Sequence, residues 1–235
     1  MTRIFYATCL ATGLAAASAG VAVAQPRGEN PFSGFYIGGE VGYDSYGINN
    51  EPYLPDYIDQ GAEGNRLAGL GGDGIAGGAV LGYNVPLGDA LILGAEGSFR
   101  YSDASGDTSL SNSSSDSKVD FNSRESWALM GRVGFMISDR TMLYGSGGWG
   151  QTHFGTRFTN TPDSGDSSIL FDHGTTRDAW RVGGGIETAL GGNWTARLDY
   201  TYSNYSGYDI TVAPGDTLHV DPQSHQFTLG VNYYF

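Results

Sequence analysis

Apolar and polar residues alternate in eight stretches of the chain after Pro31, and each stretch suits a β-strand. Side chains of a strand point alternately to its two faces, so a period of two gives one apolar and one polar face. The stretches are 33–46, 74–85, 90–102, 124–137, 141–154, 178–190, 194–205 and 224–235. Each reaches the roughly 9–11 residues that a tilted strand needs to cross a bilayer.

The connections between these stretches alternate between short and long. Residues 86–89, 138–140 and 191–193 have the composition of tight hairpin turns. The other four, 47–73, 103–123, 155–177 and 206–223, are polar and rich in Gly, Ser, Asn and Asp, and residues 105–117 are expected to be mobile. The pattern predicts an all-β fold: an eight-stranded antiparallel up-and-down transmembrane β-barrel with short periplasmic turns and four long extracellular loops.

The apolar face of the predicted strands carries no charged residue, and its aromatic residues gather toward the strand ends, as in the two interfacial girdles of a membrane barrel. Those near the turns are Phe35, Phe135, Trp194, Tyr233 and Phe235, and those near the loops are Tyr43, Tyr101, Trp127, Trp149, Trp180 and Tyr202. The alternative is an exported β-sandwich. Its outer face would lie in water and carry scattered charges rather than Gly, Ser and Thr.

The polar face carries four acids and four arginines, which the barrel would turn inward. They are Glu40, Glu96, Arg100, Arg132, Arg181, Glu187, Arg197 and Asp199. Side chains just fill an eight-stranded barrel, and unpaired buried charges are costly, so the balance predicts a salt-bridged, water-poor plug. Counting from the turns pairs Glu187 with Arg197 and makes Arg132 the expected hub of the acids. The alternative is that the same charges line a narrow pore or gate.

The N-terminal residues have the layout of a secretory signal peptide. Arg3 precedes an apolar, alanine-rich run that ends at the small-residue site Ala22-Val23-Ala24. We therefore expect residues 1–24 to be a signal peptide, 25–32 a short periplasmic segment and 33–235 the barrel domain. Removal of Arg3 and of Cys9, the only cysteine, would leave 11 basic and 25 acidic residues, a net charge of −14 without thiol chemistry.

The composition and motifs favour no enzyme and no cofactor. An acidic chain is repelled by nucleic-acid phosphates, so no nucleic-acid partner is expected. The Gly-x-Gly-x-x-Gly spacing of residues 145–150 falls inside a predicted strand, without the helix that dinucleotide binding needs. The four histidines, His153, His173, His219 and His225, map to loops or outer strand ends. Solvated side chains are the preferred interpretation there, although Asp172-His173, His219-Val-Asp221 and Ser224-His225 could also support metal binding or base catalysis.

Four strand motifs carry a family resemblance. They are the opening Ser33-Gly-Phe-Tyr-Ile-Gly-Gly-Glu-Val-Gly-Tyr43, the stretches 143–149 and 194–202, and the closing alternation of Phe227, Leu229, Val231, Tyr233 and Phe235. The chain resembles the small bacterial outer-membrane β-barrel family, which includes porin-like and opacity-type surface proteins, and is similar to the OmpA membrane domain. The resemblance implies residence in the cell outer membrane among lipid and lipopolysaccharide. It also implies that the five closing residues are an assembly signal for the barrel-assembly machinery.

Several functions are compatible with this fold, because fold transfers between relatives better than activity. We favour a structural, surface-exposed protein whose loops are a contact surface and whose extracellular ligand is unknown. Loop-mediated ligand binding or adhesion, to a host surface or to haem through Tyr53, Tyr57, His173 and His219, is the main alternative. A small passive porin-like channel and a lipid-modifying enzyme are further alternatives. The acidic loops could also gather divalent cations among lipopolysaccharide phosphates.

Overall fold

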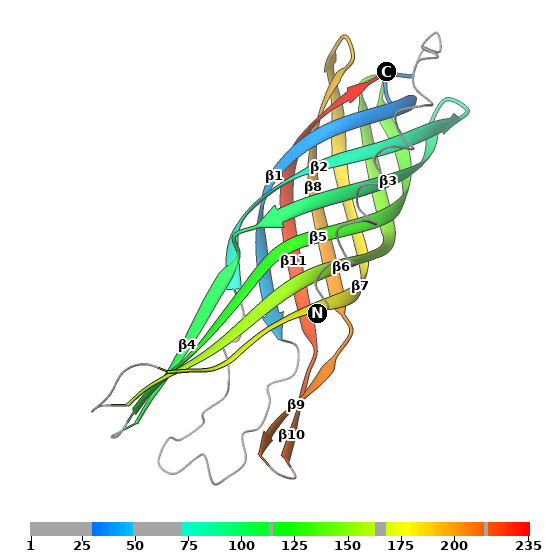
Figure 1. The fold of residues 1–235 in the computed structure, drawn as a ribbon. Coiled ribbons are helices and arrows are strands. Elements are labelled where there is room, and N and C mark those ends of the chain that lie inside the picture. The colour runs from blue at the N-terminus through cyan, green and yellow to red at the C-terminus, as the bar shows by residue number, and fades with distance from the viewer. Residues whose placement is uncertain (1–29, 49–71, 113–114, 163–167, 214–215) are drawn as a thin grey trace, which may run out of the picture.

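Eight antiparallel strands close into a barrel in the computed structural model, which describes residues 30–48, 72–112, 115–162, 168–213 and 216–235 (Figure 1). The barrel strands are β1 (Gly34–Ile48), β2 (Gly72–Leu87), β3 (Leu91–Ser102), β5 (Ser115–Ser138), β6 (Thr141–Pro162), β7 (Ser168–Gly191), β8 (Trp194–Tyr205) and β11 (Pro222–Tyr234). Neighbours in this series pair along the wall, and β1 pairs with both β2 and β11. The first strand therefore meets the last, and the predicted up-and-down barrel is confirmed.

Short turns join β2 to β3, β5 to β6 and β7 to β8 at the end of the barrel where the chain finishes. Gly88 and Gly192 lie in these turns with φ values of 75° and 55°. Only glycine adopts this left-handed region without steric cost, which explains why both turns contain it. At the same end, the Phe235 amide donates to the Phe35 carbonyl at 2.9 Å and fastens the last residue to the first strand.

The opposite end differs from the prediction, because three of the four expected loops contain strands. The additional strands are β4 (Ser105–Asn112), β9 (Tyr208–Ala213) and β10 (Asp216–Val220). Strands β5, β6 and β7 also continue far past the barrel wall, and β4 extends their sheet (Figure 1). Segments 103–123, 155–177 and 206–223 are thus long connections, as predicted, but they contain strands that were not predicted. The fourth connection falls on residues 49–71, outside the described residues.

The physical reason for this difference is that an existing strand templates the next one. Residues 105–112 have too few apolar side chains to predict a strand alone, but they extend hydrogen-bonded ladders that the barrel wall has already aligned. The unpaired backbone groups of an edge strand are a template for a further strand, whatever its side chains bury. Burial-based prediction therefore misses them.

The outer face of the barrel is apolar, as predicted. The exposed fraction of the residue surface is 61% for Leu129, 61% for Leu229 and 58% for Phe35. Ile186, Leu198 and Leu229 are register partners across β7, β8 and β11 and form an apolar row, in which Leu198 lies midway between Trp194 and Tyr202 of β8. Among the described residues, no helix is long and apolar enough to cross a membrane.

Aromatic residues form two belts around this surface. The rings of Trp127 and Trp149 pack edge to face 5.0 Å apart toward the loop end, and those of Trp194 and Tyr233 do so at 5.1 Å near the turns. Such belts mark the two membrane interfaces. The predicted signal peptide, residues 1–24, lies outside the described residues.

Candidate functional site in the barrel interior

The interior of the barrel consists of a charged layer between two apolar layers. The layer at the turn end contains Phe32, Tyr36, Val80, Ile92, Met142, Tyr144 and Tyr234. The layer at the loop end contains Tyr46, Ala104, Phe154, Ala179 and Tyr205. Phe32, from the predicted periplasmic segment, is completely buried and packs against Tyr234. Both ends of the interior are therefore filled by rings and apolar side chains.

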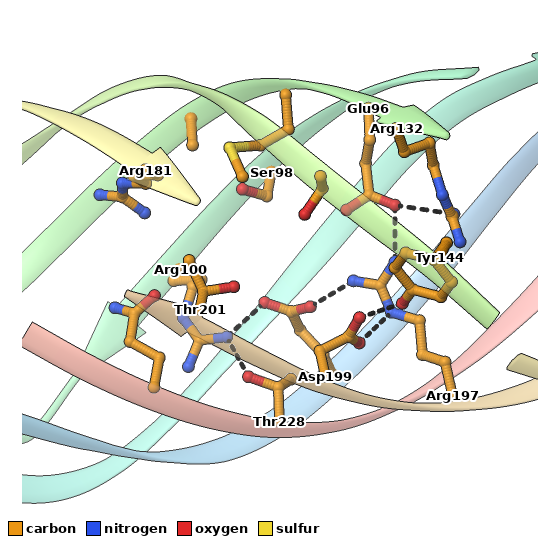
Figure 2. Close-up of a pocket in the computed structure, with 15 residues that line it drawn as sticks. Glu96, Ser98, Arg100, Arg132, Tyr144, Arg181, Arg197, Asp199, Thr201 and Thr228 are labelled. Carbon is orange, nitrogen blue, oxygen red and sulfur yellow. Dashed lines mark hydrogen bonds and ion pairs between the residues drawn. The ribbon is translucent and has the colours of Figure 1, made fainter. Parts of the chain in front are cut away.

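The charged layer brings together seven of the eight predicted interior residues through ion pairs. Arg100 lies 2.6 Å from Glu40, Arg132 lies 2.8 Å from Glu187 and 3.5 Å from Glu96, and Arg197 lies 2.8 Å from Glu40, 2.6 Å from Glu96 and 3.0 Å from Asp199. Figure 2 shows Arg132 and Arg197 converging on Glu96. The carboxylates are thus shared between arginines rather than held in isolated pairs.

The expected partners within this network are wrong in two respects. Arg197, not Arg132, is the hub, since it contacts three carboxylates. Glu187 and Arg197 are register partners, as counted from the turn, but Glu187 pairs instead with Arg132. Long side chains in a narrow barrel reach across the axis, so a neighbouring backbone position does not decide the partner.

Arg181 and Asp44 depart from the predicted balance. Among the described residues, Arg181 has no carboxylate within ion-pair distance, and its guanidinium donates to the hydroxyls of Ser126 at 3.3 Å and Thr152 at 3.1 Å. Asp44, which sequence reasoning missed, lies 2.8 Å from Arg100. Asp44 follows Glu40 at an even spacing on β1, and this parity was the available signal. Among the residues that the structure describes, the charged layer and Arg181 thus bring five carboxylates and four guanidinium groups into the interior.

Two tyrosines, also missed, connect the charged layer to the apolar layer at the turn end. The Tyr36 hydroxyl donates to Glu96 at 2.6 Å and accepts from Arg132 at 2.9 Å. The Tyr144 hydroxyl donates to Asp199, and the Arg132 guanidinium lies 3.9 Å from the centre of the Tyr144 ring. Burial of a tyrosine requires a partner for its hydroxyl, and the acids supply one.

Glycines on the inner face make room for these large side chains. A Cβ atom added to Gly82 would lie 2.2 Å from the Tyr36 ring, and one added to Gly230 would lie 3.0 Å from the Arg197 guanidinium. The high glycine content thus has a packing origin at these two positions. A cavity of about 50 Å³ lies between the arginines and the hydroxyls of Ser98, Ser146 and Thr201, which is enough for a few water molecules.

The histidine side chains that can be placed are held by neighbouring residues. His225 is hydrogen-bonded to the Tyr200 hydroxyl at 2.8 Å on the outer face, whereas Ser224 is fully buried, so the two do not form a catalytic pair. His153 is bonded to Thr176 at 3.1 Å. Among the described residues, no group of three or more His, Cys, Asp or Glu side chains could hold a metal ion. Tyr53 and Tyr57 lie outside the described residues.

Comparison with known proteins gives the family. A family model described as an outer membrane protein beta-barrel domain matches residues 7–235. The chain belongs to this outer-membrane β-barrel family. It is 25% identical to the 31 kDa outer-membrane immunogenic protein of Brucella melitensis over 100% of this chain and 97% of that protein. It is also 26% identical to the 22 kDa outer membrane protein of Rhizobium leguminosarum, over 86% and 78% of the two chains.

A solved structure gives a weaker likeness. OprG of Pseudomonas aeruginosa is 11% identical to this chain, with a TM-score of 0.47 over 88% of this chain and 99% of that one. The family places the protein in the cell outer membrane, where the apolar face contacts lipid and lipopolysaccharide surrounds the outer rim. The charged layer is therefore the interior of an outer-membrane barrel.

A double-mutant cycle tests whether Glu187 pairs with Arg132 rather than with its register partner Arg197. Glu187→Gln and Arg132→Gln are expected to be coupled by about 1–3 kcal/mol in unfolding free energy, because the two groups are in contact. Glu187→Gln and Arg197→Gln are expected to be closer to additive. Urea unfolding of the three single and two double variants in lipid vesicles measures both couplings. Stronger coupling of Glu187 to Arg197 than to Arg132 would contradict the observed pairing.

Proposed function

We propose that this protein is a non-enzymatic, structural component of the outer membrane whose barrel is a plugged anchor for an extracellular contact surface. The observation that carries this proposal is the filling of the interior. Buried arginines and carboxylates occupy the middle, and rings occupy both ends. A continuous water path would require these side chains to move apart, which would expose several desolvated ion pairs at once.

The plug is tested by single-channel recording in planar bilayers. The native protein is expected to produce no steady conductance, since buried ion pairs and apolar side chains occupy the interior. Replacing Arg132 and Arg197 together by alanine is expected to create openings by removing two of the buried guanidinium groups. Tyr43→Ala, on the lipid face, is the control. A large steady conductance of the native barrel would favour the alternative of a passive channel.

The contact surface is supported by the sheet that continues beyond the barrel, formed by β4 and the outer parts of β5, β6 and β7. Backbone register aligns one row of mostly charged residues across it: Asp107, Asp120, Arg157 and Asp172. The next row, on the other face by the period of two, is uncharged: Thr108, Val119, Phe158 and Phe171. A mostly charged row beside an uncharged row, on a sheet that continues beyond the barrel, favours binding over simple solvation, and adhesion is thus the second candidate function.

Adhesion is tested with paired substitutions on the two faces of this sheet. Cells that display the protein are compared for attachment to immobilised protein, polysaccharide and bare plastic. Phe158→Ser and Val119→Ser are expected to reduce attachment to one of these surfaces, whereas Thr159→Ser and Ser109→Ala, on the opposite face, are expected to leave it unchanged. Equal attachment of all variants at equal surface display would contradict the role in adhesion.

Two further proposals concern export and assembly. Residues 1–24 are proposed to be removed as a signal peptide, which N-terminal sequencing of the outer-membrane form tests directly.

The outward side chains Phe227, Leu229, Val231, Tyr233 and Phe235 are proposed to be recognised by the barrel-assembly machinery. Their exposure on the last strand supports this, because a recognition signal must be accessible.

A further inference from the structure

The last strand has a register problem that its outer face cannot solve. From Phe227 onward its outward residues are all large and mostly apolar, so along this part a slip of two residues exchanges one such side chain for another. A slip of one residue would turn the apolar face inward, but a slip of two preserves the faces. The register in which the last strand closes the barrel, and hence the shear of the barrel, must therefore be specified by the side chains of the inner face.

The inner face of β11 differs at each position. Gly230 lies against Arg197, where a Cβ atom would be 3.0 Å from the guanidinium. A slip of two residues would place Thr228 or Asn232 there, and either side chain would collide with Arg197. Asn232 in turn fits beside Gly38, whose added Cβ would lie 2.0 Å from the Asn232 amide oxygen. The native register is thus the one in which small and large residues match.

Steric clashes disfavour the shifted registers, and hydrogen bonds to Glu187 favour the native one. One carboxylate oxygen accepts hydrogen bonds from Asn232 at 2.9 Å and Tyr234 at 3.0 Å, both on β11, and from Thr195 at 2.6 Å. The other oxygen accepts from Arg132 at 2.8 Å. Glu187 is 0% exposed, as are Asn232 and Tyr234. A shifted register would remove the Asn232 and Tyr234 donors from this buried carboxylate, and leaving a buried charged group without hydrogen-bond donors costs stability.

The position of Glu187 lets it bind the closing strand at a distance. It lies on β7, while β8 separates β7 from β11 in the wall. The Tyr234 hydroxyl also accepts from Asn84 of β2 at 3.1 Å. Through Glu187 and its partners, the last strand is therefore bonded to β2, β5, β7 and β8, most of which it does not touch along the wall.

We propose that Glu187, together with the inward residues Asn232 and Tyr234, is a register latch that selects the closing position of the last strand. Glu187 is a positioning residue in this role. The latch is separate from the outward assembly signal, because it acts through the opposite face of the same strand.

Engineered disulfides across the β1–β11 seam test the latch in refolded full-length protein with Cys9→Ser. Val41 and Leu229 are outward register partners, so cysteines at these positions report the native register. Val41→Cys with Phe227→Cys or with Val231→Cys reports slips of two residues, since a disulfide needs Cα atoms about 4.4–6.8 Å apart. Copper phenanthroline supplies the oxidation. The unmodified interior is expected to give only the native crosslink.

Variants of the latch are then compared with a matched control. Tyr234→Phe with Asn232→Ala, and separately Glu187→Gln, are expected to lose part of the native crosslink and to gain a slipped one. Tyr233→Phe removes the same hydroxyl one residue away on the lipid face and is expected to retain the native pattern. If Glu187→Gln does not refold, the Tyr234→Phe and Asn232→Ala variant decides. Exclusively native crosslinks in the latch variants would overturn the proposal, because lost stability alone does not change register.

Discussion

Replacing Arg197 with methionine is expected to lower the free energy of unfolding by about 3–5 kcal/mol, the range for a buried ion pair broken from one side. Arg197 lies within 3.0 Å of Glu40, Glu96 and Asp199. After the change, Asp199 would keep the Tyr144 hydroxyl but no cation within ion-pair distance among the described residues. A buried carboxylate without a counter-charge is the source of the loss.

Urea unfolding in lipid vesicles, followed by tryptophan fluorescence and by heat-modifiable migration on a gel, measures this loss. Arg181→Met is the matched control, since Arg181 is equally buried but, within the described part of the chain, donates to the hydroxyls of Ser126 and Thr152 and has no carboxylate within ion-pair distance. Its expected loss is about 1–3 kcal/mol, the range for unsatisfied hydroxyl partners. A loss for Arg181→Met equal to that for Arg197→Met would contradict the role of Arg197 as hub of the network.

An arginine in place of Leu198 is expected to lower the free energy of unfolding by about 2–4 kcal/mol, the range for a cation on the lipid face at the bilayer midplane. Leu198 lies midway along β8, in the apolar row with Ile186 and Leu229, and 49% of its surface is exposed. The charge would be placed in hydrocarbon, and its side chain would have to reach one of the two interfaces.

Leu190→Arg is the control for this prediction. Leu190 is 61% exposed at the turn end of β7, where a cation is expected to cost only about 0–1 kcal/mol. The two variants are unfolded in the same vesicles, so the difference depends on depth alone. Equal losses would mean that Leu198 does not face the middle of the bilayer.

Aggregation or slow insertion could obscure both measurements, so each is paired with a fold check. Circular dichroism of strands and resistance of the barrel to protease are recorded before unfolding. Variants that pass both checks are compared in unfolding free energy.

Within the membrane, the pattern of the sequence was sufficient to predict the fold. Charged side chains and unpaired backbone groups are costly in hydrocarbon. Apolar and polar residues therefore alternate along the strands between Phe35 and Phe235, and these strands form a closed barrel. The same constraint identified the inward side of Glu40, Glu96, Arg132 and Glu187 without any structure. Outside the membrane this constraint disappears. The strands β4, β9 and β10 form where water would also have tolerated loops, and the sequence pattern did not predict them.

By itself, the sequence determined which residues face lipid, which face inward and where the chain turns, because a two-residue period and a solvent without hydrogen-bond partners leave no other choice. Only the tertiary structure decided which interior side chains form ion pairs and hydrogen bonds with one another. Arg197 rather than Arg132 became the hub, and Glu187 bonded to Arg132 and Tyr234 instead of its register partner. Long side chains cross a narrow barrel, so their partners depend on distances between strands that are remote in sequence.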